Sequence, residues 1–315
     1  MDKIAPVLSG TDPLDLPAPP SQRPGFVLSA LLMLYGIESL LFRTMQALHR
    51  FGMRMHLSAQ RVFAGLCAEA LTVDEKSALT VRIYDSFPDY RSVGDTLYVW
   101  EEPWFASRLP PPPARVLVGA CGTGREAIAL AERGYRVDAV EPAPEFVGES
   151  RRRLGTRGQV FRASYEQLSA LVLDEADGGQ PLQRARYDAV ILGSGSLTHV
   201  LDPREQQRIL NAVSVLCPQG PILASFFCEN DDAGPPPTGR AMRLGRRIGR
   251  LVGRARRLRD APSDRLSYRA HSGFAYTYTP REIERLAHGA GREVAWEQGD
   301  MRPFHYATFL PPRSS

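Results

Sequence analysis

The stretch VLVGACGTG at residues 116–124 decides the fold, together with VDAVEP at residues 137–142. The apolar residues that begin each stretch predict short buried strands, and the residues after Gly124 predict a helix. Glycines in a strand–turn–helix segment let the backbone approach a ligand closely, and the helix N-terminus offers free N–H groups. Glu141 ends the second predicted strand, where a carboxylate can accept hydrogen bonds from both hydroxyls of a ribose.

Strands and helices alternate from this stretch onward. Strands are predicted at 115–118, 135–141, 160–163, 187–192 and 221–227, with a helix after each of the first four. This alternation predicts an α/β fold with a doubly wound, mostly parallel sheet. A helix at 279–290 opens with the capping-box pattern, and strands at 293–298 and 304–310 follow it too closely for a helical crossover. We therefore expect a seven-stranded sheet that ends in an antiparallel pair.

Two cofactor classes fit the glycine turn. Gly122, Gly124 and Ala127, with Glu141 downstream, also satisfy the dinucleotide fingerprint, so a NAD(P)-dependent oxidoreductase is the alternative enzyme. The chain contains only two lysines, Lys3 and Lys76. A catalytic Tyr-x-x-x-Lys pair, a Walker A lysine and a Schiff base are therefore excluded from the predicted α/β domain.

Residues 115–310 resemble the class I (Rossmann-like) methyltransferases that depend on S-adenosylmethionine (SAM). GACGTG (119–124) resembles the first motif of that family, and VDAVEP resembles the second. YDAVILGSGSLTHVLD (187–202) resembles the fourth-strand motif, and LCPQGPILASF (216–226) resembles the stretch that leads into strand five. The resemblance implies SAM as cofactor and methyl transfer to an oxygen or nitrogen of a small molecule or peptide.

The resemblance also implies roles for individual residues. The residues implied at the methionine part of SAM are Gly119, Ala120, Cys121, Gly122 and Gly124; at the ribose, Glu141 and Pro142; at the adenine, Ser164 and Tyr165; and at the methyl-transfer site, Gly193, Ser194 and Gly195. The sequence departs from the family where Val118 replaces an acidic residue and Ala120 replaces the first glycine. We therefore expect another group, from the N-terminal segment, to meet the SAM ammonium. A non-catalytic SAM-binding protein is the second alternative.

A general base assists methyl transfer when the nucleophile is protonated at neutral pH. His199 is the first candidate, because it follows the fourth strand at the edge where ligands bind in such folds. His271 and His305 are weaker candidates, and the alternative for each is a histidine with only local hydrogen bonds. Tyr84 is the second catalytic candidate, from an aromatic and acidic cluster of Tyr84, Asp85, Tyr90, Trp100, Glu101 and Glu102. This cluster either closes over SAM or packs the helical region onto the domain.

Residues 240–265 carry ten arginines against two aspartates, whereas the whole chain has a net charge of +4. The segment 238–260 predicts a basic amphipathic helix, inserted near the substrate mouth as a packed lid. A membrane-surface or acidic-partner contact through residues 240–259 is the alternative. Sequence-specific nucleic-acid binding is not expected, because the charge is confined to one segment. The four cysteines lack zinc-ligand spacing, so no metal site is expected, and the chain is expected to be cytoplasmic.

The N-terminal part is predicted as a Pro-rich arm at 1–24 and a helical cap region with linker at 25–113. Four prolines at 110–113 give the best boundary to a SAM-binding domain at 114–315. Residues 24–42 are nearly all apolar and marginally long enough to span a membrane, but Glu38 and Arg43 favour a buried amphipathic helix.

Overall fold

A computed structural model describes residues 26–86, 94, 96–174, 182, 185–229, 239–258, 265–269, 272–297 and 304–312; for 26–32 it describes the backbone alone. The predicted arm at 1–24 lies outside these residues. Two compact units divide the chain between His56 and Leu57. The second unit includes residues 57–113, which precede or contain the four prolines and which the predicted boundary assigned to the N-terminal region.

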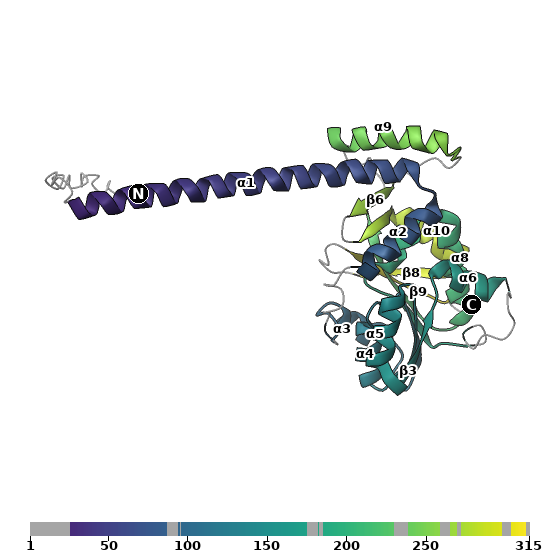
Figure 1. Cartoon of the computed structure of the whole chain (residues 1–315). Helices are drawn as coiled ribbons and strands as arrows, with labels where there is room; N and C mark the ends of the chain where they lie inside the picture. Colours follow the sequence, from purple (N-terminus) through teal and green to yellow (C-terminus); the bar gives the residue numbers. More distant parts are fainter. Residues whose placement is uncertain are drawn as a thin grey trace, which may run out of the picture. The chain divides into compact units, whose positions relative to one another are not determined.

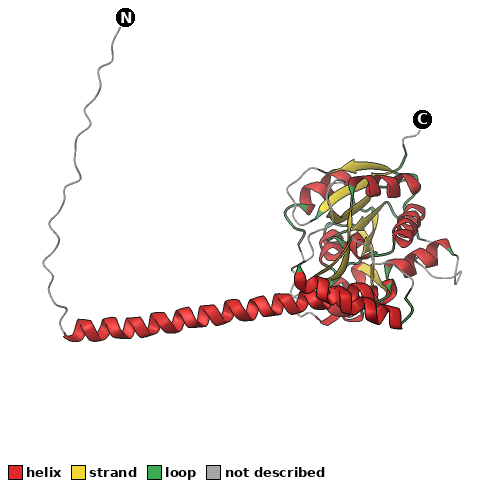
Figure 2. Cartoon of the chain, turned by 90° about the horizontal axis from the view of Figure 1, so that it is seen from above, coloured by secondary structure: helices red, strands yellow, loops and turns green. Residues whose placement is uncertain are grey.

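The α/β unit is built on a mostly parallel sheet, as predicted (Figure 2). Its five parallel strands lie in the order β3, β2, β1, β4, β5. Their bounds are β1 Arg115–Gly119, β2 Arg136–Glu141, β3 Gly158–Arg162, β4 Ala189–Leu192 and β5 Ile222–Cys228. The carboxyl ends of β1, β2 and β4 therefore meet at one edge of the sheet, and the residues after these strands form the candidate site.

The predicted C-terminal antiparallel pair is confirmed. β9 (His305–Leu310) pairs antiparallel with β5, and β8 (Glu293–Trp296) pairs antiparallel with β9. These two strands complete the seven that were predicted.

A β-hairpin that was not predicted adds two further strands. β6 (Leu266–Arg269) and β7 (Gly273–Tyr278) pair antiparallel, and the end of β7 runs parallel to the last two residues of β5. The hairpin extends the sheet beyond the carboxyl end of β5, next to the site.

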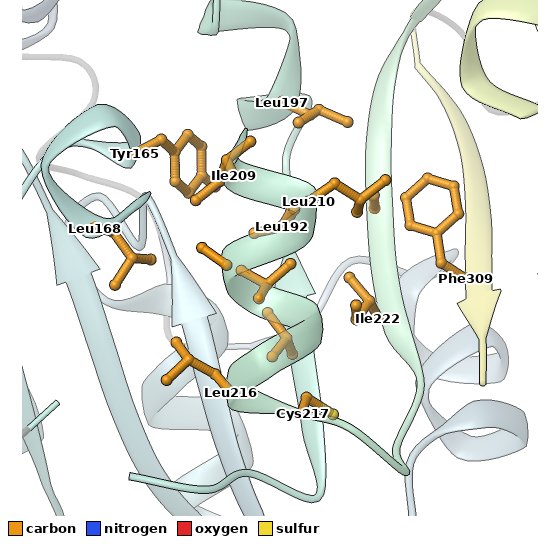
Figure 3. Close-up of a cluster of buried hydrophobic side chains, with 14 of the residues drawn as sticks. Tyr165, Leu168, Leu192, Leu197, Ile209, Leu210, Leu216, Cys217, Ile222 and Phe309 are labelled. Atoms are coloured by element: carbon orange, nitrogen blue, oxygen red, sulfur yellow. The ribbon is translucent and has the colours of Figure 1, made fainter. Parts of the chain in front are cut away.

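Helices cover both faces of the sheet (Figure 1). One face carries α4 (Arg125–Glu132) and α5 (Pro144–Leu154), and the other carries α6 (Tyr165–Leu173), α8 (Pro203–Leu216) and α10 (Pro280–Gly289). Alternation along the strands sorts the side chains, since Val116 and Val118 face α4 whereas Leu117 faces α8. Figure 3 shows the α8 side, where leucine and isoleucine side chains interleave with those of β4 and β5.

Side-chain caps fix the starts of three helices. Ser164 with Gln167 and Thr279 with Glu282 form capping boxes for α6 and α10, and Asp202 accepts the Arg204 N–H at the start of α8. The predicted capping box of α10 is thus confirmed.

Three helices precede the sheet: α1 (Phe26–Ala70), α2 (Val73–Ser86) and α3 (Glu101–Arg108). The prediction that residues 24–42 form a buried helix is wrong for the side chains that are described, because Leu40 is 66% and Phe42 56% exposed. Among the described residues, no helix has both the length and the hydropathy that crossing a membrane requires. The last part of α1 packs on the hairpin, where Cys67 joins Phe274 in a buried cluster.

The basic insert forms α9 (Arg240–Ala255), within the predicted range. Its packing differs from the prediction, in which the apolar stripe packs down. Gly245, Gly249 and Gly253 are buried against α1, whereas Leu244 and Leu251 are more than half exposed. Glycine brings two helix backbones closer together than any other residue does, so the glycine row forms the contact.

Candidate active site

The loop Gly119–Gly124 connects β1 to α4 and keeps an open side. Ala120, Gly122 and Gly124 have φ values of 47°, 56° and 93°. A Cβ placed on Gly122 would meet nothing within 4 Å, so a ligand can approach the backbone there. Ala120 is a non-glycine residue in left-handed backbone, which costs roughly 1–2 kcal/mol. The departure from glycine at this position is therefore an energetic burden on the loop.

Glu141 lies at the end of β2 with its carboxylate turned to this loop. Its oxygens accept the Gly122 N–H at 2.8 Å and the Ala143 N–H at 2.9 Å. The side chain is almost fully buried, and burial raises its pKa to about 7 in spite of both backbone hydrogen bonds. Each oxygen retains a lone pair for a further donor. Pro142 follows, half-buried, before the start of α5.

Cys121 is buried beneath the same loop. Burial, and then the nearby Glu141 carboxylate, raise the pKa of its thiol well above the usual range. A thiol of this kind is inert as a nucleophile. Cys121 thus supports the loop, and its backbone N–H donates to the carbonyl of Val140.

The two residues after β3 are already engaged within the fold. The Ser164 hydroxyl accepts the Gln167 N–H as the α6 cap. The Tyr165 hydroxyl lies 2.7 Å from Ser196 Oγ, and a Cβ on Gly119 would come within 2.7 Å of it. Tyr165 therefore packs under the glycine loop and joins it to the segment after β4. The adenine contact of both residues stays a prediction.

The segment after β4 requires small residues. A Cβ on Gly193 would lie 2.5 Å from Glu126 Oε1, and one on Gly195 would lie 2.1 Å from the Phe304 ring. The Ser194 hydroxyl donates to Glu126 at 2.9 Å, and Ser194 is the exposed residue of the three. This segment therefore packs closely against the first turn of α4.

A buried ionic network that the sequence did not indicate lies next to the segment after β4. The Arg125 guanidinium donates to both Glu101 oxygens and to Glu126 Oε1, and all three side chains are almost fully buried. Burial and the neighbouring Glu101 raise the pKa of Glu126 above its usual range. The network brings two carboxyl groups to one guanidinium beside the segment after β4. Glu101 comes from the N-terminal part, where a group for the SAM ammonium was expected.

The two catalytic candidates, Tyr84 and His199, are hydrogen-bonded to each other. Tyr84 Oη on α2 lies 3.0 Å from His199 Nε2, at the end of the 3-10 helix η3 (Ser196–His199). His199 Nδ1 lies 2.8 Å from the carbonyl oxygen of Phe274 on β7. A carbonyl only accepts, so Nδ1 carries the hydrogen and Nε2 accepts the Tyr84 O–H. Burial lowers the pKa of His199.

The C-terminal turn of α2 spans the site. Next to Tyr84, Asp85 Oδ1 accepts the Glu145 N–H at the start of α5, at 3.0 Å. The turn therefore contacts both the start of α5, beside Glu141, and the segment after β4. This position is that of a cap over the carboxyl edge of the sheet.

The members of the aromatic and acidic cluster lie in two different places. Trp100 stacks on Tyr306 of β9 with ring centroids 5.4 Å apart, and Glu101 pairs with Arg125. Glu102 pairs with Arg133 at the surface. These members pack α3 onto the domain, whereas Tyr84 and Asp85 contact His199 and the start of α5; their predicted closure over SAM stays a prediction. Tyr90 lies outside the described residues.

The other candidates contribute little. His305 is exposed at the start of β9, and His271 lies outside the described residues. Among the residues that are described, no three His, Cys, Asp or Glu side chains are grouped so that they could hold a metal ion.

Residues 116–220 match the family model described as a methyltransferase domain. They contain the glycine loop, Glu141, the segment after β4 and His199. The match agrees with the predicted methyltransferase domain over these residues. No curated protein matches the chain significantly.

Several solved structures are similar to the chain. One is 1,6-didemethyltoxoflavin-N1-methyltransferase from Burkholderia thailandensis, at 21% identity and TM-score 0.47, covering 77% of this chain and 92% of that one. Another is an amino pentose methyltransferase from Micromonospora echinaspora, at 16% identity and TM-score 0.45, with coverages of 78% and 94%. A third is the magnesium protoporphyrin IX methyltransferase of Synechocystis, at 14% identity and TM-score 0.46, with coverages of 75% and 97%.

Proposed function

We propose that this protein transfers the methyl group of SAM to an oxygen or nitrogen of a small molecule, with the Tyr84–His199 pair as the proton acceptor. The observation that carries the proposal is the hydrogen bond between these two side chains, 3.0 Å long, at the carboxyl edge of the sheet. They come from elements 115 residues apart in the chain. The fold thus brings a phenol and an imidazole together at the carboxyl edge of the sheet.

The residues around the loop fit SAM. Gly122 leaves an open cradle for the methionine part, and the Glu141 carboxylate has acceptor capacity left for ribose hydroxyls. Ser194 is the exposed residue of the proposed methyl-transfer segment, Gly193–Gly195. When bound, SAM supplies a methyl group that is electrophilic because it is attached to a sulfonium. The protein's own task is then to position the acceptor and remove its proton.

The hydrogen-bond directions around His199 define how a proton moves. Phe274 O fixes the hydrogen on Nδ1, so the lone pair of Nε2 holds the Tyr84 hydroxyl by its hydrogen. In the proposed step the Tyr84 oxygen accepts an O–H or N–H of the substrate. As the substrate loses its proton to Tyr84, Tyr84 passes its own to Nε2. The lowered pKa of His199 keeps the imidazole neutral and able to accept at neutral pH.

A small molecule is favoured over a nucleic-acid base. The residues after β4 are Gly-Ser-Gly-Ser, which lack the Pro-Pro-aromatic sequence expected for methylation of a base amino group. α2 caps the same edge through Tyr84 and Asp85. A peptide side chain is the second acceptor class, and the assay below includes one.

The test measures S-adenosylhomocysteine release with a panel of phenols, amino sugars, aromatic amines and a short peptide as acceptors. We expect acceptor-dependent release, and a loss of about 100-fold or more in kcat for Tyr84→Phe and for His199→Gln, the range of general-base catalysis. Binding of S-adenosylhomocysteine by both variants should stay unchanged.

The matched control is Tyr276→Phe. Tyr276 lies in the hairpin that supports His199, and the substitution removes a hydroxyl that donates to Glu282 of α10. It should retain full turnover. Full turnover by Tyr84→Phe and His199→Gln as well would refute the role of the pair.

A further inference from the structure

α9 carries a four-residue repeat that gives it three distinct faces. The triplets Leu244-Gly245-Arg246, Ile248-Gly249-Arg250 and Val252-Gly253-Arg254 each place an apolar residue before a glycine and an arginine after it. Successive residues of an α-helix lie about 100° apart, so each kind of residue forms its own row. The helix therefore presents a glycine row flanked by an apolar row and an arginine row.

The glycine row fixes the orientation of the helix. A Cβ on Gly245 would lie 2.1 Å from the Val62 carbonyl oxygen, and one on Gly249 would lie 2.6 Å from that of Leu66. On the partner helix, a Cβ on Gly65 would lie 2.4 Å from the carbonyl oxygen of Met242. Because the two backbones touch, no side chain of the apolar row can turn inward.

The apolar row is consequently exposed. Leu244, Ile248, Leu251 and Val252 are 53%, 42%, 62% and 39% exposed. Their spacing of three and four residues aligns them along one side of the helix. A continuous apolar row of this kind on the surface of a protein marks an interaction site.

The charge beside this row selects the partner. Arg247, Arg250 and Arg254 are exposed, and residues 240–255 contain no acidic residue. A second copy of the same face would bring two arginine rows together, which Coulomb repulsion opposes. A nucleic acid would pair with the arginines but leave the apolar row in water.

We infer that α9 binds the surface of an anionic phospholipid bilayer, with its apolar row among the acyl chains and its arginines on the lipid phosphates. Interfacial helices combine one apolar face with an arginine-rich polar face, as α9 does. An anionic bilayer surface satisfies both rows at once. This inference is independent of the methyltransferase function.

The test is co-sedimentation of the full-length protein with vesicles of phosphatidylcholine, with or without about 30% phosphatidylserine. We expect binding to the anionic vesicles alone, falling as salt is added. Leu244→Gln with Leu251→Gln should weaken binding about tenfold or more, and so should Arg247→Gln with Arg250→Gln and Arg254→Gln. These positions are exposed, so the variants should keep the wild-type melting temperature.

Matched controls separate α9 from general surface effects. Val215→Gln changes an apolar residue of α8 that is 44% exposed, and Arg136→Gln changes an exposed arginine at the start of β2. Both should bind like the wild type. Equal binding to neutral vesicles, undiminished binding by the α9 variants, no binding at all, or tighter binding to duplex RNA or polyglutamate than to anionic vesicles would overturn the inference.

Discussion

Glu141 is the residue at which pH should control cofactor binding. Burial raises its pKa from 4.5 to about 7, so the group changes charge near neutrality. A carboxylate accepts hydrogen bonds through both oxygens, whereas the protonated acid presents a donor on one of them. Binding of ribose hydroxyls therefore favours the ionised form. The affinity should be full above pH 7 and fall below it, by at most about tenfold per pH unit.

Calorimetric titration with S-adenosylhomocysteine from about pH 5.5 to about pH 8.5 measures how the affinity depends on pH. The variant Glu141→Gln removes only this carboxyl group. Any ionisation of the ligand affects the titrations of both proteins equally. The affinity of the variant should be lower at high pH, with a flatter profile. Parallel profiles for the two proteins would place the titrating group elsewhere.

At the scale of elements, the Glu101–Arg125–Glu126 network joins α3 to α4. Glu101 and Arg125 form a buried pair, and removing one partner of such a pair costs about 3–5 kcal/mol. The raised pKa of Glu126 means that the folded state favours its protonated form. Its stabilising contribution is present below the ordinary carboxyl pKa and is lost as the pH rises through the higher folded-state pKa.

The two acids should therefore respond differently to amide substitution. Glu101→Gln should lower the free energy of unfolding by several kcal/mol, because Arg125 stays buried without its main partner (about 3–5 kcal/mol). Glu126→Gln resembles the protonated acid and should cost much less, and its stability relative to the wild type should improve with rising pH. Urea unfolding at neutral and alkaline pH measures both effects. Equal losses would contradict this account of the network.

The contact between α1 and α9 depends on backbone approach. Gly249→Ala places a Cβ 2.6 Å from the Leu66 carbonyl, so the helices must separate, at a cost of about 1–3 kcal/mol. Gly239→Ala is the control, because nothing lies within 4 Å of its added Cβ. Thermal unfolding should show a clear loss for Gly249→Ala and little for the control. Equal melting temperatures would show that the close approach does not stabilise the protein.

Elements with strong local signals were predictable, and contacts over long separations were not. The bounds of α5 and α8 follow from an N-terminal proline and an apolar period, and Thr279 marked the start of α10. The β6–β7 hairpin was missed because it follows an arginine-rich insert, whose sequence directed attention to the helix. That hairpin supplies the Phe274 carbonyl that orients His199.

In the candidate site too, local motifs were predictable and long-range contacts were not. The glycine loop, Glu141 and the residues after β4 follow from local motifs, and Tyr84 and His199 were each identified separately. Their hydrogen bond across 115 residues could not be read from spacing. Arg125 and Glu126 were missed because they stand inside a helix, where charged residues are usually solvated.

At the scale of the whole molecule, the described residues divide into an α/β unit that contains the site and a helical segment with many exposed apolar side chains. The buried residues of the described chain begin at Ala64. Met33 and Leu48 of α1 are each 66% exposed. The apolar period of the sequence could not predict this exposure, because a period does not specify what the apolar face packs against. The site, the cap from α2 and the sheet edge all belong to the second unit, residues 57–315.

The most direct test of the central claim is calorimetric titration of the full-length protein with SAM and S-adenosylhomocysteine, with NAD(H) as the control ligand. We predict micromolar binding of both adenosyl ligands, no binding of NAD(H), and loss of binding in Glu141→Ala, which removes the carboxylate beside the loop. Absence of adenosyl binding by the wild type, or tighter binding of NAD(H), would contradict the account and return the glycine loop to the dinucleotide-binding alternative.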